Sequence, residues 1–290
     1  MSDKPTILLQ LDTDEQPSVF DRIVALDAGA QQVLSYGGVK PDAVRDLVHG
    51  CIFTRGGKDL HRTAIFIGGS SIGSGSALRE EARKSMLPAY GLQVSILLDS
   101  SGANTTAAAA VRTAARHLEL ASAKALVLGG TGPVGQRVAR LLAGQGAQVR
   151  IGSRQVEKAE AVCAAIRDQI PGAKVTAVAT ASSKDGPQAL DGRNLVVAAG
   201  AAGVILLPKR LWTASSTLKV MIDLNAVPPA GIEAVEAMDN GAERDGVLCF
   251  GALGIGGLKM KVHKAAIAKL FERNDLVLDA EEVFALAQQI

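Results

Sequence analysis

One segment, residues 125–135, constrains the fold of this chain more than any other. Its sequence is Ala-Leu-Val-Leu-Gly-Gly-Thr-Gly-Pro-Val-Gly, an apolar run that leads directly into glycines at positions 130, 132 and 135. In a Gly-x-Gly-x-x-Gly turn, the first glycine permits a tight turn, the second lets the backbone approach a pyrophosphate, and the third lets the next helix pack closely on the strand. The chain contains 31 glycines, so the predicted dinucleotide site depends on the residues that flank this turn.

The flanking residues have the pattern of a strand, a helix and a second strand. Apolar residues recur at helical spacing from Val134 to Leu142, and Gly144 and Gly146 then end the predicted helix. Residues 148–151, Gln-Val-Arg-Ile, follow as the second strand. This unit predicts a Rossmann-like domain, in which the turn and the helix N-terminus bind the phosphates of a dinucleotide.

The residues after the second strand indicate which dinucleotide binds. Proteins selective for NAD usually have Asp or Glu there, and its carboxylate accepts a hydrogen bond from the ribose 2′-hydroxyl. This chain has Gly152, Ser153 and Arg154 instead, and its next acid is Glu157, inside the next predicted helix. Ser153 and Arg154 are donors suited to a 2′-phosphate, so we expect NADP, with additional use of NAD left open. In the alternative, Arg154 is a solvated loop cation.

The C-terminal half contains further predicted strands at residues 174–180, 195–200 and 220–224, and a helix at residues 156–170. In doubly wound sheets, ligands bind beyond the carboxyl ends of the strands. The candidate cofactor contacts are therefore the residues of the glycine-rich turn and those at the ends of the strands. They are Gly130, Thr131, Gly132, Pro133, Val134, Gly135, Ser153, Arg154, Ala199, Gly200, Asn225 and Ala226.

Strands and helices also alternate in the N-terminal part of the chain. Short apolar runs bounded by glycine are typical of buried parallel strands. The predicted strands are residues 6–11, 51–54, 64–67 and 92–98, and the predicted helices are residues 18–27 and 41–50. On the first of these helices, we expect Val19, Phe20, Ile23 and Val24 to point inward.

These patterns predict the α/β fold class, with two α/β domains, of which the C-terminal one has a Rossmann-like doubly wound parallel sheet. An Ala-rich helix that begins at Asn104 is expected to lead from the first domain to the second. We place the domains at residues 1–120 and 121–274. The C-terminal segment, residues 275–290, could pack back on the first domain.

Composition and residue spacing exclude several classes of function. A net charge of +2, from 31 basic and 29 acidic residues without a basic block, argues against nucleic-acid binding. The chain lacks an apolar leader and a long apolar run, which predicts a cytoplasmic protein without a membrane segment. Its three cysteines and four histidines show no metal-ligand spacing, so we expect no metal site, and cysteines that are reduced and buried.

Several longer segments in both predicted domains are more specific than the glycine turn. They are Asp12-Thr-Asp14 with Pro17-Ser-Val-Phe-Asp21, Thr54-Arg-Gly-Gly-Lys58, Thr63-Ala-Ile-Phe66, Leu98-Asp-Ser100 with Asn104-Thr-Thr-Ala-Ala-Ala109, the turn itself, and Phe250-Gly-Ala-Leu-Gly-Ile-Gly-Gly-Leu-Lys259. In these segments, and over nearly its whole length, the chain resembles the bacterial NADP-dependent methylene-tetrahydromethanopterin dehydrogenases of one-carbon metabolism. The resemblance implies oxidation of the methylene bridge on a reduced pterin to the methenyl form, with NADP⁺ taking the hydride, in formaldehyde oxidation and methylotrophy. It also implies a two-domain fold, with the pterin bound by the N-terminal domain, and a homo-oligomer, a trimer or hexamer.

The implied reaction explains why the chain shows no set of residues for base catalysis. A carbon between two nitrogens gives up a hydride readily, because the nitrogen lone pairs stabilise the cation that forms. The protein therefore has to orient the reacting carbons more than to remove a proton. The candidates for positioning the pterin are Lys259, Asp21 and Asp99, and the further candidate substrate contacts are Ser18, Lys58, Asn104 and Thr105.

Each of these candidates has a simpler alternative. Residues 18, 21, 104 and 105 could be helix N-caps or first-turn residues, and Lys58 and Lys259 could be solvated cations. Lys259 is expected to share one face of a helix with His263. Tyr36 and Lys40 have the Tyr-x-x-x-Lys spacing of short-chain dehydrogenases, but two glycines between them and Pro41 after them predict a turn rather than one helical face.

Three other functions compete with the methanopterin reaction. The same chemistry on methylene-tetrahydrofolate is the nearest, because the two carriers share the reacting part of the pterin. A dehydrogenase for shikimate-type hydroxy acids would need a base for the hydroxyl proton, and the sequence shows no convincing one. A catalytically silent NADP-binding sensor would keep the glycine turn and Arg154 but would not bind the pterin.

Overall fold

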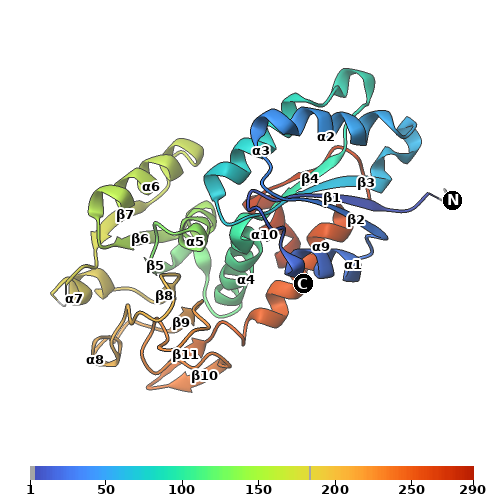
Figure 1. Ribbon diagram of the computed structural model, residues 1–290. Helices are drawn as coiled ribbons and strands as arrows, with labels where there is room; N and C mark the ends of the chain where they lie inside the picture. The colour runs from blue at the N-terminus through green and yellow to red at the C-terminus, as the bar shows by residue number, and fades with distance from the viewer. Residues whose placement is uncertain (1–3, 183) are drawn as a thin grey trace. The chain divides into compact units, whose positions relative to one another are not determined.

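Two sheets organise the chain, one in each of two units (Figure 1). The computed structural model describes residues 4–182 and 184–290. The first unit comprises Met1–Thr105 and Met260–Ile290, and the second comprises Thr106–Lys259. The chain passes from the first unit to the second inside helix α4 (Ala103–Ala115) and returns inside helix α9 (Gly256–Lys269). Both junctions thus lie within helices, earlier in the chain than the boundaries at residues 120 and 274 that we placed from the sequence.

The first unit has a five-stranded sheet in which all neighbouring strands are parallel. The spatial order is β12-β4-β3-β1-β2, with β1 at Ile7–Leu11, β2 at Gln32–Tyr36, β3 at Thr63–Ile67, β4 at Ser95–Leu98 and β12 at Val277–Leu278. Every residue of the central strand β3 is buried, as expected of a strand that is covered on both faces. The C-terminal strand β12 pairs with β4 and forms one edge of this sheet.

Four further helices belong to the first unit. They are α1 (Val19–Asp27), α2 (Pro41–Phe53), α3 (Ile72–Lys84) and α10 (Ala280–Gln288), with short 3₁₀ helices at Gly57–Arg62, Pro88–Tyr90 and Ser100–Gly102. Helix α1 begins after Ser18, whose hydroxyl caps it, and α10 begins with a capping box formed by Asp279 and Glu282. None of the helices within the described residues has the length and apolar character needed to cross a membrane.

In the first unit, the strand predicted at residues 51–54 is wrong, and strand β2 was missed. Residues 51–54 are not a strand, because Cys51 and Ile52 continue the buried helical face of α2 that begins with Val44 and Val48. Strand β2 was not predicted, because Val33 is its one fully buried residue and an edge strand of this kind lacks an apolar run.

The inward face of α1 was also predicted wrongly. Val24 is buried as expected, but Val19, Phe20 and Ile23 are 60%, 48% and 54% exposed. The buried pair on this short helix is Val24 and Ala25, so most of its large apolar side chains face outward.

The second unit has a seven-stranded sheet in the order β10-β11-β9-β8-β5-β6-β7. Its strands are β5 (Lys124–Leu128), β6 (Gln148–Ser153), β7 (Val175–Ala179), β8 (Leu195–Ala198), β9 (Val220–Asp223), β10 (Asn240–Arg244) and β11 (Val247–Phe250). Its helices are α5 (Pro133–Gly144), α6 (Val156–Gln169), α7 (Asp185–Leu190) and α8 (Lys209–Trp212), with a 3₁₀ helix at Leu120–Ser122. The strand order reverses at β5, which lies between β6 and β8, and ligands of open α/β sheets bind at such a switch point.

The hairpin of β10 and β11, the antiparallel pair of this sheet, was not predicted. Asp245 and Gly246 join the two strands, with φ angles of 50° and 77°. An Asp-Gly pair with two positive φ angles is characteristic of a tight hairpin turn, so the dipeptide was a signal that could have been used.

The three cysteines are free and buried, as predicted. Burial raises the pKa of the Cys51 thiol to about 12 and that of Cys163 to about 11, and it also raises the pKa of Cys249. Since the thiolate is the reactive form, these cysteines behave as small apolar core residues.

Candidate functional site

A cavity of about 630 Å³ lies at the carboxyl ends of β5, β6, β7 and β8, in the second unit. It is lined by residues that follow these strands and by the glycine-rich turn. They include Gly129, Thr131, Gly132, Pro133, Ser153, Arg154, Gln155, Lys158, Thr180, Ala181, Ala199 and Gly200. The structure thus brings together seven of the predicted cofactor contacts, at residues 131–133, 153, 154, 199 and 200.

The glycine-rich turn has no room for side chains at three positions. Gly129 has a φ of +66°, and a Cβ there would lie 2.5 Å from the Cα of Gly200. A Cβ at Gly130 would lie 2.6 Å from the Ile151 side chain, and one at Gly135 would lie 2.4 Å from the carbonyl oxygen of Gly129. The left-handed residue of the turn is Gly129, directly before the glycine to which the sequence assigned the tight turn, and Gly135 allows the close approach of α5.

Gly132 is less crowded than its neighbours in the turn. A Cβ at Gly132 would lie 3.3 Å from the carbonyl oxygen of Gly129, a tight contact but not a clash like those at positions 129, 130 and 135. Gly132 lines the cavity and precedes Pro133, the first residue of α5, so the positive end of this helix is directed to the same place. A backbone that stays bare next to a helix N-terminus fits a bound pyrophosphate.

Two cations lie on the cavity wall beyond β6. Arg154 follows the last residue of β6, and Lys158 lies in the first turn of α6, and both are exposed. The Ser153 hydroxyl accepts a hydrogen bond from the Gln155 N–H at 3.1 Å and can still donate its own hydrogen. The sequence analysis missed Lys158, although its place four residues after Arg154, at the start of a predicted helix, was a usable signal.

The other predicted cofactor contacts are not lining residues of this cavity. Gly130, Val134 and Gly135 shape the turn and the start of α5. Asn225 is held within its own loop, where its N–H donates to the Asp223 carboxylate and its side-chain amide donates to the carbonyl oxygen of Pro229. Contact of Asn225 and Ala226 with a cofactor stays a prediction.

Asp223 organises the loop after β9. It is 1% exposed, and its carboxylate accepts hydrogen bonds from the N–H groups of Asn225 at 3.0 Å and Ile232 at 2.7 Å. Burial raises the pKa of this carboxyl, and the backbone hydrogen bonds oppose the shift. Asp223 is thus a buried carboxylate at the carboxyl end of β9, and its hydrogen bonds hold both ends of the loop of residues 224–232.

In the first unit, two carboxylates meet where β1 and β3 end. Asp12 is buried, and its carboxylate accepts hydrogen bonds from the N–H groups of Asp14 at 2.9 Å and Ser18 at 3.0 Å. A Cβ added to Gly68, the residue after β3, would lie 3.3 Å from a carboxylate oxygen of Asp12 and 3.7 Å from one of Asp21. Both acids therefore face the backbone at the carboxyl end of β3.

A buried histidine supports Asp21 from the other side. Nε2 of His263 lies 3.9 Å from a carboxylate oxygen of Asp21, and the imidazole is fully buried while the Asp21 side chain is 15% exposed. The ring stacks on Phe66 of β3, with centroids 5.8 Å apart, and is tilted against Phe20 at 6.2 Å. His263 lies on the buried face of α9, and Lys259, one turn before it on the same helix as predicted, is half-buried.

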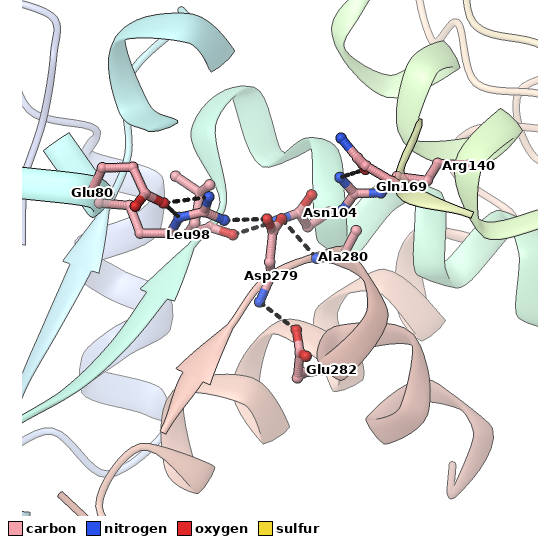
Figure 2. A network of polar contacts seen from close by, with 9 residues as sticks. Glu80, Leu98, Asn104, Arg140, Gln169, Asp279, Ala280 and Glu282 are labelled. Carbon is pink, nitrogen blue, oxygen red and sulfur yellow. Dashed lines mark hydrogen bonds and ion pairs between the residues drawn. The ribbon is translucent and has the colours of Figure 1, made fainter. Parts of the chain in front are cut away.

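Asp99, Asn104 and Thr105 are contacts within the protein at the start of α4. The Asp99 carboxylate accepts hydrogen bonds from the N–H groups of Asn104 at 2.8 Å and Thr105 at 3.1 Å, and from the Thr105 hydroxyl at 2.7 Å. The Asn104 amide donates to Asp279 (Figure 2). Asp279 also forms an ion pair with Arg79. All three predicted contacts are at most 2% exposed, so these bonds hold the helix start, and a role in binding the pterin stays a prediction.

The remaining candidates are placed as follows. Ser18 caps α1 and accepts a hydrogen bond from the Asp21 N–H at 3.2 Å, and Lys58 is exposed in a 3₁₀ helix. Tyr36 ends β2 and Lys40 is the N-cap of α2, with Gly38 between them at a φ of +61°. The predicted turn is confirmed, because Tyr36 and Lys40 do not share a helix.

A Rossmann-like unit with a bare glycine turn, a cavity at the switch point and a basic wall defines a dinucleotide-binding dehydrogenase fold. Solved structures agree with this class. The chain is similar to shikimate 5-dehydrogenase from Listeria monocytogenes, with a TM-score of 0.58 and 13% identity over 99% of this chain and 97% of that one. It is similar to quinate dehydrogenase from Corynebacterium glutamicum, with a TM-score of 0.52 and 13% identity over 99% of both chains.

Comparison at higher identity identifies the family. Residues 19–101 match the family described as Methylene-tetrahydromethanopterin dehydrogenase, N-terminal. The chain is 45% identical over 286 residues to Bifunctional protein MdtA of Methylorubrum extorquens, and 30% identical over 295 residues to the NAD(P)-dependent methylenetetrahydromethanopterin dehydrogenase of the same organism, covering 98% of each chain in both cases. The chain belongs to the methylene-tetrahydromethanopterin dehydrogenase family, which confirms the resemblance seen in its sequence segments.

Proposed function

We propose that this protein is an oxidoreductase that transfers a hydride from methylene-tetrahydromethanopterin to NADP⁺ and releases the methenyl form. The observation that carries the proposal is the match over 98% of the chain to a relative named NAD(P)-dependent methylenetetrahydromethanopterin dehydrogenase. The cavity supports NADP as the cofactor, because Arg154 and Lys158 lie on its wall where a ribose 2′-phosphate would need cations.

The residues of the chain have to bind and orient rather than to move protons. The bond that breaks joins a hydrogen to a carbon between two nitrogens, and the hydride leaves with both electrons while the nitrogens stabilise the remaining cation. NADP⁺, when bound, supplies the hydride acceptor. Gly132 and the start of α5 would hold its pyrophosphate, and Arg154, Lys158 and Ser153 would hold its 2′-phosphate. Fixed placement of the two reacting carbons lowers the barrier by several kcal/mol.

Among the candidate pterin contacts, the structure favours Asp21 over Asp99. The Asp21 side chain is 15% exposed, and the buried ring of His263, which stacks on Phe66, lies 3.9 Å from its carboxylate. Asp99 is 1% exposed and already accepts three hydrogen bonds within α4. We assign Asp21 and Lys259 to orienting the pterin and Ser18 to holding the start of α1, with Lys58 as a contact for the acidic tail of the carrier.

We further propose that the protein forms a homo-oligomer, a trimer or a hexamer, as the family resemblance implies. Apolar side chains on α1 and the edge strand β2 support an assembly surface in the first unit. Their exposed fractions are 60% for Val19, 54% for Ile23, 48% for Leu26, 46% for Leu34 and 42% for Tyr36. Exposed apolar patches of this kind often mark sites of protein association.

The direct test is formation of NADPH or NADH with methylene-tetrahydromethanopterin and methylene-tetrahydrofolate side by side, each with NADP⁺ and with NAD⁺. We expect the highest kcat/KM with the methanopterin carrier and NADP⁺. Activity mainly with the folate would assign the protein to the competing carrier. Absence of turnover with both carriers, while NADP⁺ still binds, would contradict the proposed enzyme and leave the sensor.

Two isosteric substitutions separate a substrate contact from a structural acid. Asp21→Asn should lower kcat/KM at least about tenfold and leave the melting temperature nearly unchanged, since the amide keeps the shape of the side chain and removes only its charge. Asp99→Asn should destabilise the fold by about 2 kcal/mol, because an NH₂ group replaces an oxygen that accepts N–H or O–H donors. Steady-state kinetics and thermal unfolding measure both, and an Asp21→Asn protein with unchanged kinetics would remove Asp21 from the site.

A further inference from the structure

A second cavity of the Rossmann-like unit lies at the amino ends of the strands, whereas the cofactor cavity lies at their carboxyl ends. It has a volume of about 450 Å³ and is lined by the residues at the amino ends of β6 and β7 and by Arg193, just before β8. Three of the lining residues are cations, namely Arg150, Lys174 and Arg193. The cofactor cavity is at the carboxyl ends of the same strands, so the two cavities are separate.

The hydrogen bonds of the two arginines leave donors available. Nη1 of Arg150 donates to the carbonyl oxygens of Gln188, Ala189 and Asp191, at 2.8 to 3.0 Å, and so caps the end of α7. Nε of Arg193 donates to the same Asp191 carbonyl oxygen at 3.2 Å. The contacts leave Nε and Nη2 of Arg150 and both Nη atoms of Arg193 without a hydrogen bond to the described part of the chain.

The charges at this cavity are not balanced by the protein. Arg193 is 8% exposed, and neither arginine forms an ion pair with a carboxylate of the described residues. Burial and the nearby charge of Arg150 lower the pKa of Arg193, and the Asp191 carboxylate opposes this with a smaller effect. Three cations against one carboxylate leave an excess of two positive charges. Buried charges are usually paired, and an arrangement with two like charges is costly unless an anion joins them.

We propose that this cavity binds a phosphate-type oxyanion, either free phosphate or the phosphate group of a small ester. A dianion matches the excess charge, and the forked donors of Arg150 and Arg193 suit its tetrahedral oxygens, with Lys174 as an exposed third cation. The site does not depend on the hydride-transfer reaction, and it is distinct from the place where the phosphates of NADP would bind.

The test is binding of inorganic phosphate and of glycerol 3-phosphate to the full-length protein in the presence of saturating NADP⁺, which fills the other phosphate site. Isothermal titration and the melting temperature are measured at constant ionic strength, with chloride replacing the anion in the reference. We expect saturable binding and a melting temperature that rises with phosphate. Tighter binding of the ester would assign the site to a phosphorylated metabolite, and equal or weaker binding would assign it to free phosphate.

Variants locate the site. Arg193→Gln should weaken phosphate binding about tenfold or more, and Lys174→Gln, an exposed position that does not affect folding, should weaken it about threefold. Arg210→Gln, an exposed cation of the same unit outside both cavities, should leave it unchanged. The proposal is overturned if phosphate has no effect beyond that of chloride, or if Lys174→Gln and Arg193→Gln bind phosphate as tightly as Arg210→Gln does.

Discussion

Replacing Arg154 and Lys158 together by alanine should lower kcat/KM with NADP⁺ about a hundredfold and leave the much lower value with NAD⁺ nearly unchanged. Both cations line the cofactor cavity beyond β6. A charge-assisted hydrogen bond is worth roughly 1.5–3 kcal/mol, and about 1.4 kcal/mol corresponds to a factor of ten, so two exposed contacts give about two factors of ten. Either single substitution should lower kcat/KM with NADP⁺ about tenfold.

NADP⁺ and NAD⁺ differ only in the 2′-phosphate, so comparing kcat/KM for the two cofactors isolates the contribution of contacts with this group. Initial rates with NADP⁺ and NAD⁺ are measured for the wild type, both single variants, the double variant and Arg210→Ala, an exposed cation outside the cavity. An equal loss with both cofactors would show that the two residues support the fold or the common part of the dinucleotide. Unchanged preference for NADP⁺ in the double variant would contradict the proposed phosphate contact.

Gly135→Ala should lower the free energy of unfolding of the second unit by about 3 kcal/mol and weaken NADP⁺ binding at the same time. The added methyl group would lie 2.4 Å from the carbonyl oxygen of Gly129 and 2.8 Å from the Cα of Gly130, so it meets backbone atoms that cannot rotate away. Overpacking of a well-packed site costs about 1–3 kcal/mol or more. The turn that would hold the pyrophosphate has to shift to relieve this contact.

Gly144→Ala on the same helix is the matched control. A Cβ there would meet its nearest atom, on the Ile170 side chain, at 3.7 Å, which is an ordinary contact. Alanine is a better helix residue than glycine, so we expect a gain on the order of 0.5 kcal/mol. The chain has one tryptophan, Trp212, in the core of the second unit, so its fluorescence in denaturant follows this unit alone. Equal unfolding midpoints for the two variants would refute the steric argument.

The parts of the fold that the sequence predicted correctly are those set by local rules. The glycine turn and the apolar strands of the second unit each depend on residues close together in the chain. The α/β class and sheets that are parallel except for the β10–β11 hairpin follow from the alternation of strands and helices. The cofactor cavity was predicted in large part, because strand ends in a doubly wound sheet meet at one edge.

The errors concern long-range packing. The outward face of α1 is decided by what its neighbours leave uncovered, and Val19 or Ile23 carries no local sign of this. His263 is buried because Phe66 and Asp21, far away in the sequence, surround it. The side-chain amide of Asn104 donates a hydrogen bond to Asp279, from the end of the chain, and no local pattern around Asn104 indicates this partner.

The return of the chain inside α9 has a consequence for the order of folding during synthesis. The Rossmann-like unit, Thr106–Lys259, is continuous and can fold once it has left the ribosome, whereas the first unit needs Met260–Ile290. Until β12 and Asp279 emerge, β4 has an unpaired apolar edge and Arg79 and Asn104 lack their shared acceptor. The unit that is begun first is therefore completed last, and a ribosome that stops before residue 277 leaves an open sheet edge, which is a site for aggregation.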